Sequence, residues 1–343
     1  MRAMPTCVAL TCVALFTSDH GFAEDMFYAG KTITISTHGG IAGSYDIYAR
    51  MLAAHIGKHL PGNPSVIVIN QPGAGGLTAY NFAAKAAPRD GTFFTLVSQG
   101  LPIVEALGGP GLQVSLKDMQ WIGNFTQSNT VTISWNTSPV KTLDQAKERE
   151  VVVGSSGAGS ISSQIPVAYN HLLGTRFKVI YGYEGGAQMN VAMQRGELDG
   201  RATNTWASYK NELPNDDWKK LNVLIQIGLK KEPELPNVPL LMDLVRADPQ
   251  KEAIASFLSL ALAIGRPVAA PPGVPAERVA LLRKAFDETL ADPDFLKASQ
   301  VARLEVDPMG GEDVQKIVAQ VLATPPAVVE ATKTVLEMHD VSP

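Results

Sequence analysis

The sequence predicts an α/β protein of two lobes, each built on a mainly parallel sheet flanked by helices. Runs of β-branched residues alternate along the chain with helix-like stretches, and Gly-rich loops follow the strand-like runs. The chain has 343 residues, which is more than one ordinary core contains. Hydrophobic residues make up 45% and charged residues 18% of the chain, as is usual for a globular protein.

Residues 1–23 have the features of a secretory signal peptide. Arg2 precedes the apolar run 7–16, which is too short to span a bilayer, and Gly21-Phe22-Ala23 supplies small residues before a cleavage site. A short buried helix is the alternative interpretation. Both cysteines of the chain lie in this segment, so we expect a mature protein without disulfides.

The first strand–loop–helix unit is the most informative stretch. Residues 32–36 alternate as in a strand, and Gly39, Gly40 and Gly43 then permit backbone angles that a side chain would forbid. Ser44 is expected to cap the helix that follows. A Gly-rich turn at a helix start presents backbone N–H groups that can bind an anion. A tight turn without a ligand is the alternative.

Similar units follow in order. A strand over 65–69 precedes the Gly-rich loop 70–76, a helix over 77–87 and a third strand over 92–97. This order predicts a parallel sheet with right-handed crossovers. Both glycine loops then lie at the carboxyl edge of the sheet, where open α/β sheets bind ligands.

The second half of the chain repeats this plan. The extended stretch 121–135 is expected to carry the chain from one lobe to the other. The predicted elements after it are a helix over 143–149, a strand over 151–153, a Gly- and Ser-rich loop over 154–160, a helix over 162–173, a strand over 177–183, a helix over 187–196 and a strand over 198–203. A helix over 276–290 should pack on the first lobe.

Several different short motifs are distributed along nearly the whole mature chain. They include Gly-Ser-Tyr-Asp-Ile-Tyr-Ala-Arg at 43–50, Pro-Gly-Ala-Gly-Gly at 72–76, Gly-Ser-Ser-Gly at 154–157, Leu-Pro-Asn-Val-Pro at 235–239 and Ala-Pro-Pro-Gly-Val-Pro at 270–275. In number and order, this set resembles the solute-binding receptors of tripartite tricarboxylate transporters. Each motif alone is a weak signal.

The resemblance implies a two-lobed periplasmic-binding-protein fold, the "Venus flytrap", located in the periplasm. Such a receptor captures a small carboxylate between its lobes, which can be a di- or tricarboxylate, an aromatic acid or an amino acid. It then delivers the ligand to membrane permease subunits. The resemblance further implies a monomer that needs no cofactor and catalyses no reaction.

We expect lobe one to comprise residues 24–127 and 251–343, and lobe two residues 128–250. Arg201 could pair with a ligand carboxylate, or it could be an ordinary strand-end cation. The loop between Gly39 and Asp46 is longer than the Gly-Gly-x-x-Asp of the family, so either Gly39-Gly40 or Gly43-Ser44 could face the ligand. The expected ligand-binding residues are His38, Gly39, Gly43, Ser44, Tyr45, Gly75, Ser155, Ser156, Gly157, Ser160, Glu184, Gly185, Arg201, Asn204 and Trp206.

Other functional classes are less well supported. A hydrolase could use Ser155 or Ser156 with His171, but residues 154–158 lack the last glycine of a Gly-x-Ser-x-Gly motif. A sensory binding protein for a signalling partner is a further alternative. His55 and His59 have the spacing of a helical zinc site, yet we expect an exposed helix face and no metal. The net charge of −4, without a basic run, argues against nucleic-acid binding.

Overall fold

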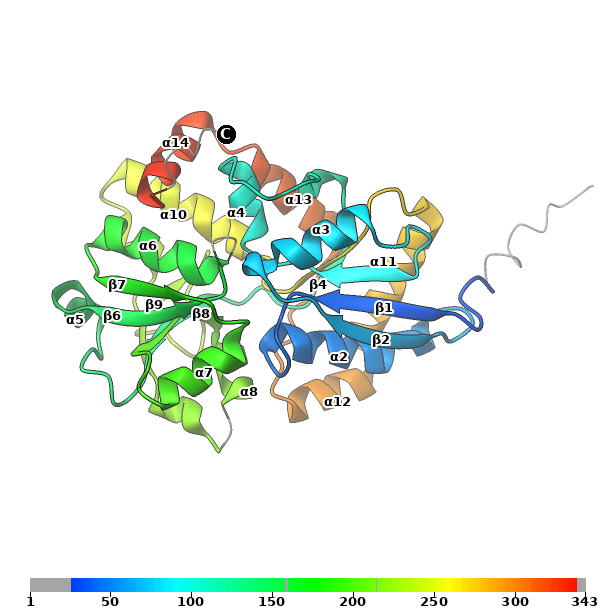
Figure 1. The fold of residues 1–343 in the computed structure, drawn as a ribbon, viewed down its shortest axis with the longest axis horizontal. Helices are drawn as coiled ribbons and strands as arrows, with labels where there is room; N and C mark the ends of the chain where they lie inside the picture. Colours follow the sequence, from blue (N-terminus) through cyan, green and yellow to red (C-terminus); the bar gives the residue numbers. More distant parts are fainter. Residues whose placement is uncertain (1–25, 158–159, 214, 338–343) are drawn as a thin grey trace, which may run out of the picture.

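The computed structural model describes residues 26–157, 160–213 and 215–337. The expected signal peptide lies outside these ranges. The described chain forms two sheets, one of six strands in the order β11-β4-β10-β3-β1-β2 and one of five strands in the order β7-β6-β8-β5-β9. They lie beside each other in Figure 1, with helices on both faces. We call the six-stranded sheet and the helices packed on it the first lobe, and the five-stranded unit the second lobe.

The strands follow the expected order along the chain. Those of the first sheet are β1 (Thr32–Thr37), β2 (Ser65–Asn70), β3 (Phe93–Leu96), β4 (Gln120–Asn124), β10 (Pro267–Ala270) and β11 (Met309–Gly310). Those of the second sheet are β5 (Thr130–Ser134), β6 (Val151–Ser155), β7 (Phe177–Tyr181), β8 (Gly200–Thr205) and β9 (Asn222–Ile227).

The sheets are more mixed than the strand–loop–helix plan suggests. Strand β1 pairs in parallel with β2 and β3, and β6 pairs in parallel with β7 and β8. Strands β10 and β5 run antiparallel to their neighbours. These two strands come directly after the chain has passed from one lobe to the other, so they enter their sheets from the opposite end.

Helices cover both faces of each sheet, which suits strands with continuous apolar runs such as β3 and β6. In Figure 1, α3 lies above the first sheet and α2 and α12 below it, whereas α6 lies above the second sheet and α7 below it. The described helices are α2 (Ser44–Ile56), α3 (Leu77–Lys85), α4 (Leu101–Ala106), α5 (Leu143–Glu148), α6 (Ile161–Leu173), α7 (Gly186–Gln194), α8 (Trp206–Glu212), α9 (Leu241–Val245), α10 (Pro249–Leu262), α11 (Ala276–Ala291), α12 (Pro293–Val301), α13 (Gly311–Leu322) and α14 (Pro326–Val335). None of them is long and apolar enough to cross a membrane.

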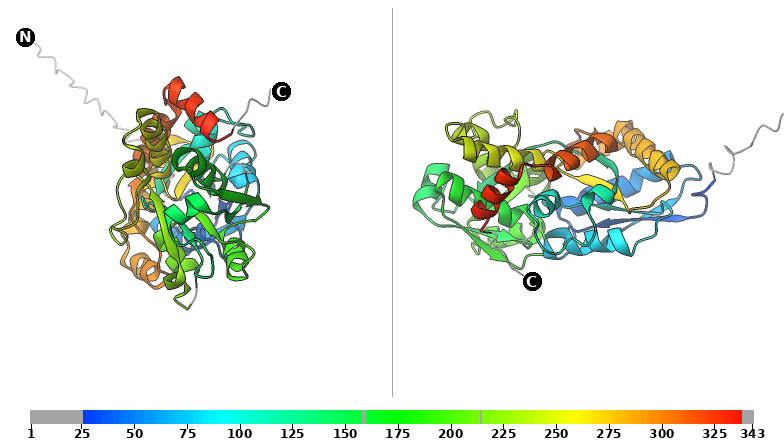
Figure 2. Two further views of the ribbon diagram at one scale, coloured as in Figure 1. Left: turned by 90° about the vertical axis from the view of Figure 1, so that its left-hand side faces the viewer. Right: turned by 90° about the horizontal axis from the view of Figure 1, so that it is seen from above.

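The chain passes between the lobes more than once. Strands β4 and β5 belong to different sheets, so the stretch 121–135 does carry the chain across, as expected. The return follows β9 through α9 and α10 to β10. Helix α13 packs on β4, and α14 packs on α6 of the second lobe. Figure 2 shows these last helices running over both lobes. The lobe limits stay a prediction, because α13 contributes side chains to the cores of both lobes and α10 packs on both α9 and α13.

Helix α11 packs on β4, the strand from which the chain leaves the first lobe. Phe286 is fully buried and its ring meets Phe125 edge-on, with ring centroids 5.0 Å apart. A Cβ on Gly123 of β4 would lie 2.4 Å from the Phe286 ring, so the strand can approach the helix only because this residue is glycine. The helix expected over 276–290 therefore packs on the first lobe.

We predict that Phe286→Ala lowers the free energy of unfolding by about 3–5 kcal/mol, because a buried aromatic is removed and a cavity is left. Denaturant unfolding measures the change. Val301→Ala is the control, since this side chain is 82% exposed. A loss below about 1 kcal/mol for Phe286→Ala would contradict its role in holding β4.

Candidate functional site

A cavity of about 90 Å³ lies between the lobes, where loops from the carboxyl ends of the parallel strands meet. The loops after β1, β6 and β7 supply most of its wall. The expected residues that line it are His38, Gly39, Gly43, Ser44, Tyr45, Ser156, Ser160, Glu184, Gly185, Arg201 and Asn204. Both glycine pairs of the first loop reach the cavity, since Gly40 lines it as well.

Four expected residues lie outside this cavity. Ser155 is fully buried beneath the loop, where it bonds Ser162. Gly75 and Gly157 meet each other where the two lobes touch. Trp206 begins α8 and donates its indole N–H to Glu234, so its ring lines a different cavity.

The glycine loops of the two lobes are in direct contact, so the lobes are closed. The Gly75 N–H donates to the Ser156 carbonyl across the cleft at 3.1 Å. A Cβ on Gly157 would lie 2.9 Å from the nitrogen of Gly75, and a Cβ on Gly185 would lie 3.2 Å from the nitrogen of Gly40. Side chains at these positions would hold the lobes apart. The glycines at this contact therefore allow the lobes to close, in addition to any role in binding a ligand.

Hydrogen bonds hold the first loop in shape. Asp46 accepts the N–H of Ala42 at 2.9 Å and the amide of Asn70 at 2.8 Å. The same Asn70 amide also reaches the Gly39 carbonyl. Burial raises the pKa of Asp46, but the bonds from Arg50, Asn70 and Ala42 outweigh it and leave the pKa below its ordinary value. Asp46 is thus ionised and braces the loop from β1 to α2.

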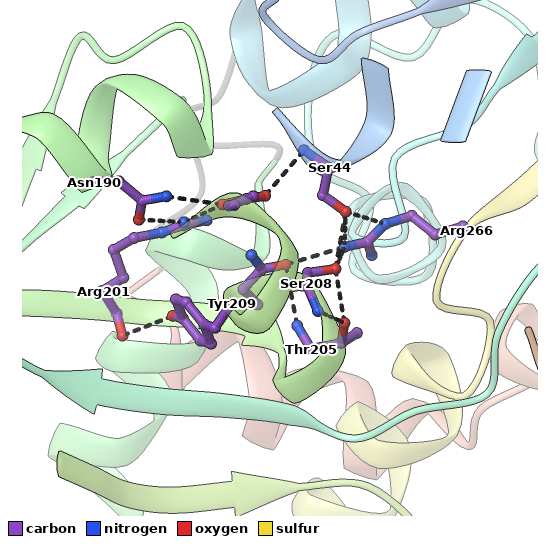
Figure 3. A network of polar contacts seen from close by, with 9 residues as sticks. Ser44, Asn190, Arg201, Thr205, Ser208, Tyr209 and Arg266 are labelled. Carbon is purple, nitrogen blue, oxygen red and sulfur yellow. Dashed lines mark hydrogen bonds and ion pairs between the residues drawn. The ribbon is translucent and has the colours of Figure 1, made fainter. Parts of the chain in front are cut away.

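Ser44 does not cap α2, contrary to expectation. Gly43 is the N-cap residue and Ser44 is the first residue of the helix. The Ser44 Oγ instead accepts from Arg266 at 2.7 Å and lies 2.9 Å from the Ser208 Oγ of the second lobe. Figure 3 shows these side chains converging from both lobes. The first turn of α2 is therefore a contact between the lobes.

Arg266 is the central cation of the site, and the sequence did not predict it. It lies just before β10, where the chain returns to the first lobe, and only 3% of it is exposed. Its guanidinium donates to the oxygens of Ser44, Gln99, Asn204, Ser208 and Gly265. Each of these acceptors is neutral.

The charge of Arg266 has no carboxylate partner among the described residues. The ring of Tyr45 stacks on the guanidinium at 4.5 Å, and that of Tyr48 lies at 5.8 Å. Such contacts stabilise a cation, but less than a carboxylate does in a buried site. Arg266 therefore makes the cavity favourable for an anion.

Arg201 is buried too, but it is already paired. Its Nη1 atom lies 2.6 Å from Oε2 of Glu212 and 2.7 Å from the Asn190 oxygen. The other oxygen of Glu212 accepts the Ser44 N–H across the cleft at 2.9 Å. Arg201 is therefore neither the surface cation nor the free carboxylate partner that the sequence allowed.

His38 is neutral in this setting. Burial and, to a smaller extent, the charge of Arg266 together lower its pKa from 6.5 to about 3. Its ring packs on Tyr45 with centroids 4.1 Å apart. A neutral imidazole offers a hydrogen bond to a ligand without adding charge.

The remaining histidine pattern is structural. His55 of α2 packs edge-on against Phe295 of α12, and His59, in the turn after α2, bonds Asp292 between α11 and α12 at 2.9 Å, so they do not form the exposed face we expected. Among the described residues, no group of three or more His, Cys, Asp or Glu side chains could hold a metal ion.

One sequence signal could have revealed Arg266. It is the only charged residue between Glu252 and Glu277, in a stretch that is otherwise apolar or small. A lone cation in an apolar run is costly to bury, so it marks either a chain reversal at the surface or a functional site. Glu212 carries no comparable signal, since it lies in an ordinary polar stretch.

Residues 48–333 match the sequence model of the tripartite tricarboxylate transporter family receptors. The chain belongs to this family. As a member, it is 26% identical over 298 residues to the UPF0065 protein in the gbd 5′ region of Cupriavidus necator, a match that covers 84% of this receptor and 83% of that protein.

Solved structures agree with this receptor fold. The periplasmic binding protein BugD superposes with a TM-score of 0.70 at 21% identity, covering 90% of this chain and 98% of BugD. MatC from Rhodopseudomonas palustris, solved with bound malate, superposes with a TM-score of 0.66 at 18% identity, covering 90% and 99%. The two-lobed periplasmic-binding-protein fold expected from the sequence is thus confirmed.

A second cavity of the receptor, of about 540 Å³, includes Trp206 and also receives residues from both lobes. Glu305 lies in its wall and accepts a hydrogen bond from Ser128. Burial, with a smaller contribution from the negative charge of Glu232, raises the pKa of Glu305 from its ordinary value of 4.5 to about 7. This carboxyl group titrates near neutral pH beside the segment that joins the lobes.

We predict that Glu305 makes the receptor less stable as pH rises. The folded protein binds this proton more tightly than the unfolded chain, so the contribution is fully present below about pH 4.5 and is lost as pH rises through about 7. Melting temperatures between pH 5 and 8 should fall less steeply for Glu305→Gln than for the unchanged protein. Glu277→Gln, at an exposed helix position, should keep the original slope. Equal slopes for all three proteins would argue against a shifted Glu305.

We predict that Gly157→Ala prevents full closure, because the new Cβ would meet the backbone of Ala74 and Gly75. Small-angle scattering should then give a larger radius of gyration. Gly182→Ala is a matched control, since Gly182 also has positive φ but has nothing within 4 Å of its Cβ position. The expectation fails if Gly157→Ala and Gly182→Ala have the same radius of gyration.

Proposed function

We propose that this protein is a periplasmic solute-binding receptor that captures a small carboxylate in the cavity between its lobes. It delivers this ligand to the membrane permease subunits of a tripartite transporter. The protein acts as a monomer, binds without chemical turnover and needs no cofactor. The lobes close over the ligand and open to release it.

The observation that carries the proposal is the buried charge of Arg266. A guanidinium taken out of water loses much of its hydration, and neutral acceptors restore only part of that loss. A carboxylate in the cavity supplies the missing opposite charge at short range, where water does not weaken the attraction. The backbone N–H groups at the starts of α6 and α7 favour an anion for the same reason.

The comparisons support the same class of ligand. MatC shares the fold, and its structure holds malate, which is a carboxylate. Family membership favours transport over signalling. A sensory role for the same binding event is the second candidate, and it predicts changed transcription instead of lost uptake when the gene is deleted.

The hydrolase alternative has little support in the geometry. The Ser155 Oγ is engaged with Ser162 and the Gly157 backbone. His171 bonds Glu337 instead. Among the described contacts, neither Ser155 nor Ser156 bonds a histidine, so the expected pair of nucleophile and base is not assembled.

We predict that Arg266→Gln weakens binding of the best carboxylate by about 2–5 kcal/mol, at least roughly thirtyfold in Kd, because one partner of a buried charge pair is removed. Calorimetry measures the affinity, and the melting temperature shows that the variant is folded. Arg246→Gln is the control, since that arginine is exposed and pairs with Asp243 on the surface. Equal affinity of the folded Arg266→Gln variant would reject Arg266 as the source of the charge.

A further inference from the structure

Three of the described residues that line the ligand cavity carry a buried hydrogen-bonding atom without a partner. Among the described residues, Asn204 Nδ2, Arg201 Nε and His38 Nε2 have no hydrogen-bond partner, although each is shielded from water. Asn204 is 6% and Arg201 5% exposed. Unpaired buried polar atoms are rare in folded proteins and call for an explanation. Oxygen atoms of a ligand in this cavity can supply partners for all of them.

The orientation of the Asn204 amide is fixed by its neighbours. Its oxygen accepts the Arg266 guanidinium at 3.0 Å and the Thr205 N–H at 3.0 Å, so among the described residues its NH₂ group is left without an acceptor. This donor lies next to the unpaired charge of Arg266. A carboxylate bound by Asn204 Nδ2 would therefore lie close to Arg266, which has no counter-ion in the part of the chain that the structure describes.

A second anion position in this cavity is already taken by the chain itself. Glu212 accepts the Ser44 N–H at the start of α2 and the Arg201 guanidinium, and it also accepts the Asn190 amide at 3.1 Å. A helix N-terminus and an arginine are the partners that a carboxylate seeks. Because Glu212 occupies both, a ligand does not have them for a second carboxylate.

The buried charges of the cavity wall also favour a ligand with a single carboxylate. Arg266 and Arg201 each carry a positive charge and Glu212 carries a negative one, while Glu184 is exposed to solvent. One net positive charge remains. A single ligand carboxylate neutralises it, whereas a second would be removed from water without a buried counter-charge.

We propose, building on the receptor function above, that the ligand is a short monocarboxylate with a neutral hydroxyl or carbonyl oxygen. Its carboxylate is bound by Asn204 Nδ2 beside Arg266, and its neutral oxygen accepts from Arg201 Nε. The cavity of about 90 Å³ is small, which favours a short acid over a long or bulky one.

Calorimetry with three acids of equal chain length tests the proposal. The protein is first unfolded and refolded to remove any co-purified ligand. 2-Hydroxybutyrate carries one charge and a hydroxyl, butyrate lacks the hydroxyl, and malate adds a second carboxylate. We expect 2-hydroxybutyrate to bind at least about tenfold more tightly than either, as one unmatched polar or charged group typically costs this much or more.

The outcomes separate the two proposals. If malate or butyrate binds as tightly as 2-hydroxybutyrate, the monocarboxylate inference is wrong and the receptor function stands. The same comparison is made with acids of three, five and six carbons. In each set the affinities of the hydroxy acid, the plain acid and the dicarboxylic acid are measured. If none of these acids binds, the monocarboxylate inference is wrong, and tricarboxylic, aromatic and amino acids are then measured in the same way; the carboxylate-receptor function is rejected if none of those binds either.

Glu212→Gln provides an independent test within the chain. It keeps the shape of the side chain and removes its charge, so the wall would carry two net positive charges. The affinity for malate relative to 2-hydroxybutyrate should rise at least about tenfold. Glu197→Gln, at an exposed position, should leave this ratio unchanged. An unchanged ratio in Glu212→Gln overturns the role of Glu212, and if the variant does not fold, the three-acid comparison on the unchanged protein decides alone.

Discussion

The buried charge of Arg266 is the interaction on which the rest of the site depends. The residue lies where the chain re-enters the first lobe, and its guanidinium touches Ser44 of the first lobe and Asn204 of the second. It therefore links the crossing segment, the helix start at α2 and the second sheet in one network (Figure 3). A carboxylate that neutralises this charge would stabilise the same arrangement that closes the lobes, so binding and closure share one physical cause.

The glycine loops form the contact between the two closed lobes. The sequence suggested that they hold the ligand with backbone N–H groups. In the structure, several of these glycines instead bring the two lobes into backbone contact, as between Gly75 and Ser156. Close approach of two backbones needs small residues on both sides. The loops thus close the cavity from solvent, while Arg266, Arg201 and Glu212 supply the buried charges of its wall.

Local patterns predicted much of the fold. The alternation of strands, glycine loops and helices correctly predicted β1, β6, α6 and α11, because each depends on neighbours in sequence. The site was harder, since its polar contacts are long-range. Glu212 and Ser44 lie 168 positions apart, and Arg266 and Ser44 lie 222 apart. Loop residues such as His38 and Ser156 could be predicted from their place after a strand, whereas the pairing of charges could not.

The path of the C-terminal helices has a mechanical consequence. Two crossings near β4 and β10 alone would let the lobes both bend and twist about each other. The chain passes between the lobes a third time, after α13 on the first lobe and before α14 on the second. Any opening must bend at all three places, and α10, which leads into β10, packs on both α13 and α14 beside the third link. Each added link leaves fewer ways for the lobes to separate, which favours a hinge motion that returns the glycine loops to the same contact.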